Sequence, residues 1–217
     1  MKILGIETSC DETAAAIVEN GDQILRNVVV SQIDIFASYG GVIPEIAARS
    51  HLEAILPVIH QAFTEAGLKP NDWSKIDAIA VTNTPGMLGS LLVGTLSART
   101  ISILHHIPFY PVHHLKSHIY ANWLTEKPEF PILALVISGG HTQIIRMKHH
   151  NHFEIIASTR DDAVGECFDK IAKILGLPYP GGPAISNLAK SGNPHRFTFP
   201  HPLANSLDFS RRISVTA

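Results

Sequence analysis

Two histidines in the stretch HHLKSH, residues 113–118, are the first residues of this sequence whose type and spacing suggest chemistry. If the stretch is helical, His114 and His118 lie on one face, one turn apart. Neutral imidazoles at this spacing suit a divalent transition metal. Because a protein metal site needs three or four ligands, the pair is half of a site and further ligands must come from elsewhere.

A peptidase interpretation of the pair is weak. A zinc peptidase helix reads His-Glu-x-x-His, with the glutamate as general base. Here the residues between the two histidines are Leu-Lys-Ser. His113 would point to another side of the helix, and we expect it to be structural. The other histidine clusters, at residues 105–106 and 148–152, are expected to be solvated and to bind nothing specific.

The composition excludes several classes of protein. Of the 217 residues, 45% are hydrophobic, which is enough for a core and excludes a disordered chain. A net charge of −2 lacks the basic excess of most polyanion-binding proteins, so any nucleic-acid contact must be local or shared with a partner. Cys10 and Cys167 are too few for a disulfide framework. Without a signal peptide or a run of about 18 apolar residues, we expect a soluble, cytoplasmic protein with no membrane contact.

A pattern of three strands with tight turns occurs twice and would position these groups. It comprises KILGIET, TAAAIVE and QILRNVVVS in the first thirty residues, and FPILALVIS, HTQIIRMK and FEIIAST in residues 130–159. Thr13 and Thr142 hold matching places in the two copies. The repeat predicts two similar α/β lobes. The glycine turn at residues 139–140 could offer backbone N–H groups to a phosphate, although an ordinary hairpin turn is an equally good interpretation.

Helices are expected after each triple of strands. The first runs from about Pro44 to Ala66 with Pro57 inside it, and the second covers residues 88–105. A third should begin after Asp161-Asp162, which could cap it. Its predicted inner face consists of Val164, Phe168, Ile171 and Leu175.

Six longer stretches resemble one family, TsaD (Gcp/YgjD in older usage). They are GIETSCDET (5–13), YGGVIPEIAARSH (39–51), VHHLKSH (112–118), VISGGHTQI (136–144), GECFDKIAKILGLPYPGGP (165–183) and SLDFS (206–210). The resemblance implies the actin-like, Hsp70-like, sugar-kinase-like α/β fold with two RNase-H-like lobes. We expect a first lobe over residues 1–110, and a metal-site segment with an incomplete second lobe over residues 111–217.

The resemblance also implies an activity. The family transfers a threonylcarbamoyl group from threonylcarbamoyl-AMP to N6 of the adenosine 3′ of the anticodon, in tRNAs reading codons that begin with A. This forms the t6A modification. The old label of the family, an O-sialoglycoprotein endopeptidase, corresponds to the peptidase interpretation that the missing glutamate disfavours.

Residue roles follow from the same resemblance. In the family the histidines that match His114 and His118 bind a metal, usually described as iron and sometimes as zinc. Asp11, in the acidic turn after the first strand, is expected to have a catalytic or positioning role beside Glu12. Nucleotide-binding residues are expected at Val136, Ile137, Ser138, Gly139, Gly140, Asp169 and Gly182. For Asp169 an ion pair with Lys173 remains an alternative.

The resemblance implies partners as well: tRNA, the adenylate substrate, TsaB and TsaE. TsaB would dock on the two first-lobe helices, and the same surface could instead form a homodimer. The residues expected to supply both a core stripe and an outer one are Ile46, Ile55, Phe63, Leu91, Leu92 and Leu96, although packing on their own sheet alone is an alternative. Glu45, Arg49 and His51 could shape the cleft or a partner surface, or form a solvated helix face.

The match to the family pattern stops after about Ser210, which we interpret as a C-terminal truncation. The family's third metal ligand, an aspartate, and a nucleotide-contacting asparagine have no counterpart in this sequence. We therefore expect a weakly held metal and weak nucleotide binding. Two function classes stay open, the transferase and a non-catalytic fragment that keeps the first lobe. A kinase or hydrolase of the same fold is a third, which the motifs disfavour.

Overall fold

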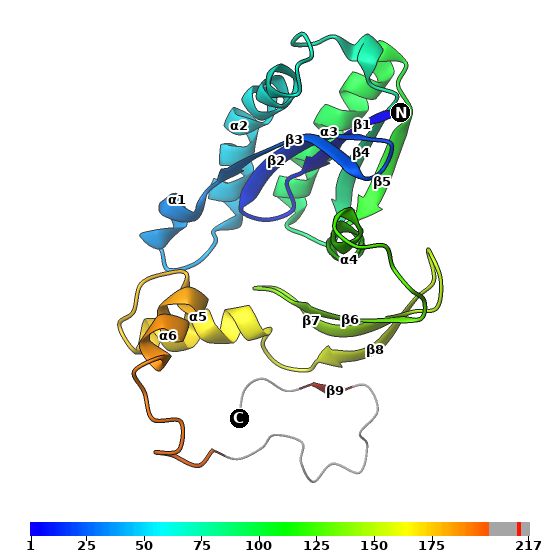
Figure 1. The fold of residues 1–217 in the computed structure, drawn as a ribbon. Helices are drawn as coiled ribbons and strands as arrows, with labels where there is room; N and C mark the ends of the chain where they lie inside the picture. The colour runs from blue at the N-terminus through cyan, green and yellow to red at the C-terminus, as the bar shows by residue number, and fades with distance from the viewer. Residues whose placement is uncertain (200–211, 214–217) are drawn as a thin grey trace. The chain divides into compact units, whose positions relative to one another are not determined.

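The computed structural model describes residues 1–199 and 212–213 and divides the chain into two units, Met1–Glu126 and Lys127–Ala217 (Figure 1). The boundary comes later in the chain than the one expected after residue 110, so the helix that carries the histidine pair belongs to the first unit. The stretch SLDFS and the expected departure from the family after Ser210 lie outside the described residues.

The first unit is built on a five-stranded sheet in the order β3-β2-β1-β4-β5. β1 is antiparallel to β2 and parallel to β4. Asn20 and Gly21, both with positive φ, form the predicted turn between β2 and β3. The strands are β1 (Lys2–Glu7), β2 (Glu12–Glu19), β3 (Gln23–Ser31), β4 (Ala78–Thr84) and β5 (Phe109–His113).

Two long helices, α2 (Pro44–Glu65) and α3 (Leu88–His105), lie side by side on one face of this sheet (Figure 1). Alternate strand residues such as Leu4, Ile6 and Ile17 are buried in the core with Ile59 and Phe63 of α2. The shorter helices are α1 (Ile33–Ala37), η1 (Trp73–Lys75), α4 (His114–Ala121) and η2 (Asn122–Leu124).

α3 is the one helix in the described part of the chain that could cross a membrane by length and composition. Only a minority of it is buried, but that minority packs against the unit's own elements β1, β4 and α2. The expected absence of membrane contact remains a prediction.

The predicted apolar residues of α2 and α3 divide between the core and the surface. Ile55, Phe63 and Leu91 are buried, because the side of each helix that faces the sheet runs through them. Of the predicted residues, Leu92 and Leu96 are exposed. Five exposed leucines on these two helices are called the α2–α3 patch below: Leu52, Leu56, Leu88, Leu92 and Leu96.

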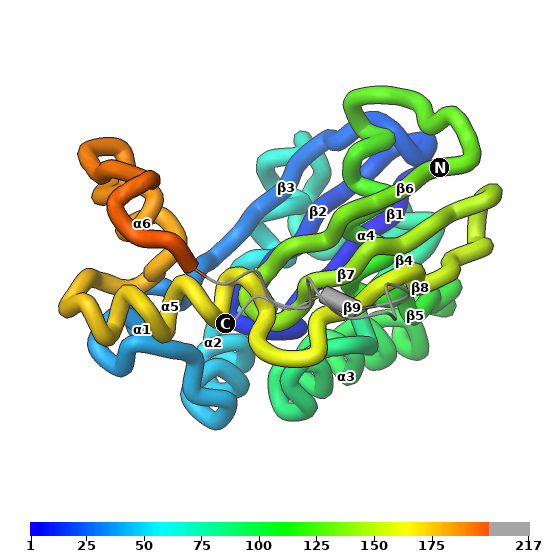
Figure 2. Tube along the Cα trace, turned by 90° about the horizontal axis from the view of Figure 1, so that it is seen from below, coloured from blue at the N-terminus to red at the C-terminus, as the bar shows by residue number. Residues whose placement is uncertain are grey.

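The second unit repeats the antiparallel three-stranded pattern with β6 (Ile132–Ile137), β7 (Thr142–Met147) and β8 (Phe153–Thr159) (Figure 2). β9 (Arg212–Ile213) pairs with β8 in parallel, so β6 is the other edge strand. The α/β fold class and the duplicated strand pattern are thus confirmed. α5 (Val164–Ile174) and α6 (Gly181–Ala189) pack against each other.

The prediction of which residues form the inner face of α5 is wrong. Phe168, Ile171 and Leu175 are exposed, and the buried residues of this helix are Cys167 and Ala172. The predicted aspartate cap is also wrong, because Ala163 is the N-cap residue and makes no side-chain cap bond. An apolar spacing alone shows that a helix has an apolar side, but not that this side is covered.

Thr13 and Thr142 connect the strands of each unit to its following helix. The Thr142 hydroxyl accepts a hydrogen bond from the Val164 N–H at 2.9 Å, and the Thr13 hydroxyl contacts Nδ1 of His51 on α2 at 2.8 Å. Both threonines are buried. A buried hydroxyl needs such a partner, so the two copies of the pattern use the same device to fix the position of a helix.

The end of β1 is anchored to the start of α3 through Thr8. The Thr8 hydroxyl donates to the Ser90 carbonyl at 2.8 Å and accepts from the Gly94 N–H at 3.2 Å. A Cβ on Gly94 would lie 2.4 Å from that hydroxyl, and one on Gly86 would lie 2.6 Å from the Ser9 carbonyl. Glycine is required at both positions because Thr8 and Ser9 of the turn after β1 occupy the space that a side chain would need.

We predict that Gly94→Ala destabilises the chain. Overpacking of a tight contact costs about 1–3 kcal/mol, which outweighs the gain of about 1 kcal/mol from replacing a helical glycine. Urea unfolding of the first unit measures the change. Gly41→Ala is the control, because a Cβ there meets nothing within 4 Å, and it should stay within about 0.5 kcal/mol of the parent chain. Equal stability of the two variants would contradict the packing argument.

Candidate functional site

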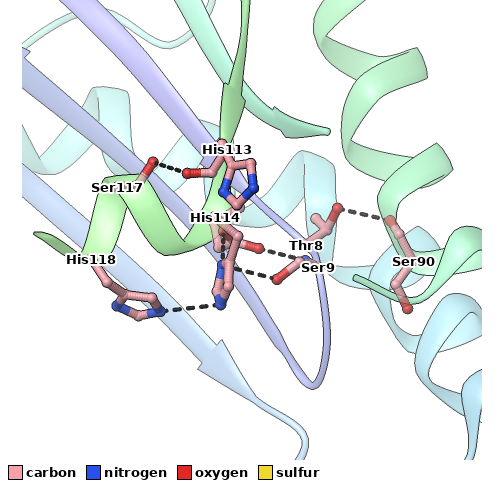
Figure 3. Close-up of polar contacts among 8 residues, drawn as sticks. Thr8, Ser9, Ser90, His113, His114, Ser117 and His118 are labelled. Atoms are coloured by element: carbon pink, nitrogen blue, oxygen red, sulfur yellow. Dashed lines mark hydrogen bonds and ion pairs between the residues drawn. The ribbon is translucent and has the colours of Figure 1, made fainter. Parts of the chain in front are cut away.

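The histidine pair lies on α4 as predicted. β5 ends at His113, so His114 and His118 fall on consecutive turns of one helix face (Figure 3). Their Nε2 atoms are 3.1 Å apart, and the two rings meet edge to face with centroids 4.5 Å apart. Burial lowers the pKa of His118, with a smaller effect from His114. The two ring nitrogens that face each other are therefore suited to bind one ion as neutral ligands.

Glu7, at the end of β1, holds the other side of the His114 ring. Its Oε2 lies 2.9 Å from His114 Nδ1, and its Oε1 accepts the Ser9 N–H at 2.5 Å. Burial alone would raise the pKa of Glu7, but hydrogen bonds from His114, Ser9 and Thr82 lower it to about 2. Sequence analysis missed Glu7, although a single acidic residue at the end of an apolar strand is a signal in itself.

The pair fits two positions of a metal site. Two nitrogens that each lie about 2.0–2.1 Å from a tetrahedral ion are about 3.3 Å apart, close to the observed separation. In the described ranges, 1–199 and 212–213, no group of three or more His, Cys, Asp or Glu side chains is arranged to hold a metal ion. Glu7 does not supply the third ligand, since it contacts Nδ1 and the facing atoms are Nε2.

Three side chains in the turn after β1 influence each other. Cys10 is exposed as a residue, but partial desolvation of its thiol and the neighbouring charge of Asp11 raise the pKa of the thiol to about 12. The pKa of Glu12 is raised by burial and by the charges of Asp11 and Glu7. The Asp11 carbonyl accepts the Gln32 N–H at 2.9 Å, which fixes the backbone of the predicted catalytic residue. Cys10 is thus a poor nucleophile, and Asp11 remains the proposed chemical group of this turn.

His51 fixes the same turn from α2. Its Nε2 lies 2.9 Å from the Cys10 carbonyl, so Nε2–H donates there and Nδ1 accepts from the Thr13 hydroxyl. The residue is fully buried, and burial lowers its pKa. The solvated-face alternative is therefore wrong for His51, although Glu45 and Arg49 of the same helix are exposed.

The predicted nucleotide-binding stretch forms the turn between β6 and β7. Val136 is buried and Ile137 is exposed. Ser138 closes the turn, because its N–H donates to the His141 carbonyl at 2.8 Å and its hydroxyl accepts the His141 N–H at 3.0 Å. Gly139 and Gly140 are exposed, and an added Cβ at either would meet nothing within 4 Å.

Asp169 and Gly182 lie where α5 meets α6. Asp169 Oδ1 accepts the Gly181 N–H at 2.7 Å, and Gly182 is in the first turn of α6. No ion pair between Asp169 and Lys173 is found in the described residues, whereas the nearby Lys170 pairs with Asp162 and Glu166. One oxygen of Asp169 therefore has a structural role at the start of α6.

Comparisons with known proteins point in one direction. The family model of TsaD, tRNA N6-adenosine threonylcarbamoyltransferase, matches residues 23–213. The enzyme of that name from Bacillus subtilis is 56% identical over 193 residues, which is 89% of this chain and 55% of that protein. Its Halalkalibacterium halodurans counterpart is 53% identical over 210 residues, or 96% and 60% of the two chains.

The chain thus spans between 55% and 60% of the length of these two relatives. Among solved structures, the ethanolamine utilization protein EutJ from Carboxydothermus hydrogenoformans is 13% identical with a TM-score of 0.49, covering 86% of this chain and 60% of that one.

We predict that the free energy of unfolding falls below pH 6.5, in part because of His51. Its pKa in the folded chain is below the value of about 6.5 in an unfolded chain. The unfolded state therefore binds more protons in acid. The stability that the neutral ring contributes is complete above about pH 6.5 and is lost as the pH falls towards the folded pKa. His51→Gln should cost about 1–3 kcal/mol at pH 7.5 and should flatten this slope.

Urea unfolding at pH 7.5 and 5.5 measures both effects. His113 and His118 also have lowered pKa values, so part of the slope should remain in the variant. His60→Gln is the matched control, because His60 is exposed on the same helix. An unchanged slope in His51→Gln would contradict the prediction.

Proposed function

Because the chain belongs to the TsaD family of tRNA N6-adenosine threonylcarbamoyltransferases, we propose that it takes part in threonylcarbamoyl transfer to the adenosine 3′ of the tRNA anticodon. The observation that carries the proposal is the pair His114 and His118, whose Nε2 atoms face each other at 3.1 Å. It lies beside a β1 end that also bears the Asp11 turn. Both features belong to stretches that resemble the family.

The proposed reaction is an acyl transfer. The adenosine N6 forms a bond to the carbamoyl carbon of threonylcarbamoyl-AMP, and the bond from that carbon to the phosphate oxygen breaks, so AMP leaves. N6 loses a proton in this step, and the Asp11 carboxylate is the group proposed to take it. A bound iron or zinc, held by His114 and His118, would supply Lewis-acid stabilisation of the charge that develops.

The second unit is proposed to bind the adenylate. An added Cβ at Gly139 or Gly140 would meet nothing within 4 Å, so that side of the turn is open, whereas Gly165 packs against the Gly139 backbone. A phosphate is proposed to approach the turn from its open side. Val136 and Ile137 lead into this turn, and Ser138 holds it closed. The oxygen of Asp169 that does not cap α6 suits a ribose hydroxyl, and Gly182 adds no side chain beside it at the start of α6.

The α2–α3 patch is the proposed docking surface for TsaB. A Cβ on Gly89 would lie 3.1 Å from Ala48 Cβ, so the two helices are in close contact there. Both helices run in the same direction (Figure 1). Leu52 and Leu56 follow this contact along α2, and Leu92 and Leu96 follow it along α3, so these exposed leucines are proposed to form one apolar surface. The same surface is available for a homodimer, and TsaE and tRNA are the further proposed partners in the cytoplasm.

We predict that Asp11→Asn lowers threonylcarbamoyl transfer about 100-fold or more. The assay supplies threonylcarbamoyl-AMP, a tRNA reading an A-starting codon, TsaB and TsaE, and it counts modified nucleoside by mass spectrometry. Asp34→Asn is the control, because Asp34 is an exposed carboxylate on α1. Modified tRNA at the parent rate from the Asp11 variant would contradict the assigned role. A chain that binds the adenylate and TsaB but forms no product would favour the non-catalytic alternative.

We predict that Leu92→Asp combined with Leu96→Asp weakens TsaB binding at least tenfold, since each charge would be buried in an apolar interface at a cost above about 1.4 kcal/mol. Light scattering and calorimetry measure the association. Ile24→Asp is the control, because Ile24 is 48% exposed on β3, away from the patch. A strictly monomeric chain that ignores TsaB would overturn this docking surface.

A further inference from the structure

The contact between Glu7 and His114 fixes which nitrogen of the ring carries the proton. An ionised carboxylate can only accept hydrogen bonds. Its approach to within 2.9 Å of Nδ1 therefore requires a proton on Nδ1. In a neutral ring the proton is then absent from Nε2, which is the atom that faces His118 at 3.1 Å. Only an unprotonated nitrogen can bind a metal ion.

The carboxylate is held in place independently of the histidine. Its Oε1 accepts the Ser9 N–H at 2.5 Å. The Ser9 carbonyl in turn accepts the Met87 N–H at 2.9 Å. Glu7 is therefore oriented by β1 and by the residues before α3.

Ser9 is the other group near the same ring nitrogen. Its hydroxyl lies 3.2 Å from His114 Nδ1, farther than the Glu7 oxygen. A hydroxyl can donate or accept, so it is compatible with either tautomer of the ring. The carboxylate is compatible only with the tautomer that has its proton on Nδ1. Glu7, and not Ser9, therefore decides the tautomer.

We propose that Glu7 is a positioning residue for the metal pair, which holds His114 in the Nδ1–H tautomer and so keeps Nε2 free as a ligand. This inference rests on the proposed metal pair, not on the transfer activity. Carboxylates behind metal-bound histidines raise ligand basicity and fix ring orientation, and their loss typically costs about 10–100-fold in metal affinity. Glu7→Gln replaces the acceptor-only group by an amide of the same shape that can donate to Nδ1, and so permits the tautomer with the proton on Nε2.

Two measurements on the complete 217-residue chain test the proposal. The first is the ¹⁵N NMR spectrum of the histidine side chains in metal-free protein. We expect the Nδ1–H tautomer for His114 in the parent chain, and a shift towards the Nε2–H tautomer in Glu7→Gln. The second is calorimetric titration with Zn²⁺ alone, for which we expect Glu7→Gln to lose about 10–100-fold in affinity.

Glu19→Gln is the matched control, because Glu19 is a partly buried carboxylate of the same sheet that pairs with Lys2 at 2.7 Å. It should change neither the His114 tautomer nor the Zn²⁺ affinity. The proposal is overturned if the parent chain shows the Nε2–H tautomer, if the parent chain binds no Zn²⁺, or if Glu7→Gln binds Zn²⁺ as tightly as the parent. The tautomer measurement needs only parent protein, so it decides the question even if Glu7→Gln does not fold.

Discussion

The hydroxyl of Thr8 is the anchor on which the arrangement of the first unit depends. It joins the end of β1 to the first two turns of α3 through Ser90 and Gly94. Because this contact is buried and leaves no space for a Cβ at Gly94, β1 cannot slide along its neighbours. The residues immediately around Thr8 in sequence, Glu7 and Ser9, therefore have fixed positions. The carboxylate that contacts His114 and the Asp11 turn are both attached at that strand end.

Two histidines are fixed from opposite sides of the turn after β1, with opposite consequences. His51 is enclosed on all sides, and both its nitrogens are used for structure. For His114, Nδ1 contacts Glu7 of the sheet, and Nε2 contacts only His118, the other member of the pair. The structural histidine thus has both ring nitrogens hydrogen-bonded to the surrounding fold, whereas the ligand histidine has only one bonded in this way.

Sequence reasoning succeeded where spacing along the chain carries the information. The histidine pair on one helix face and the repeated strands follow from periods of about four and two residues. It failed where the information is in contacts between distant segments. The role of Glu7 requires a partner 107 residues away, and the exposure of Phe168 and Ile171 depends on what covers α5. The sequence likewise left open which apolar side of α2 meets the sheet, and the structure shows that it is the side with Ile55 and Phe63.

The first unit is one uninterrupted stretch, Met1–Glu126. This has a consequence for synthesis on the ribosome, where domains generally fold as units, the N-terminal one first. β1 is made at the outset, but its partner β4 begins only at Ala78 and the helix that carries His114 comes later still. Glu7 therefore stays without its histidine until nearly all of the unit has been synthesised. The histidine pair would then be complete before the strands of the second unit emerge.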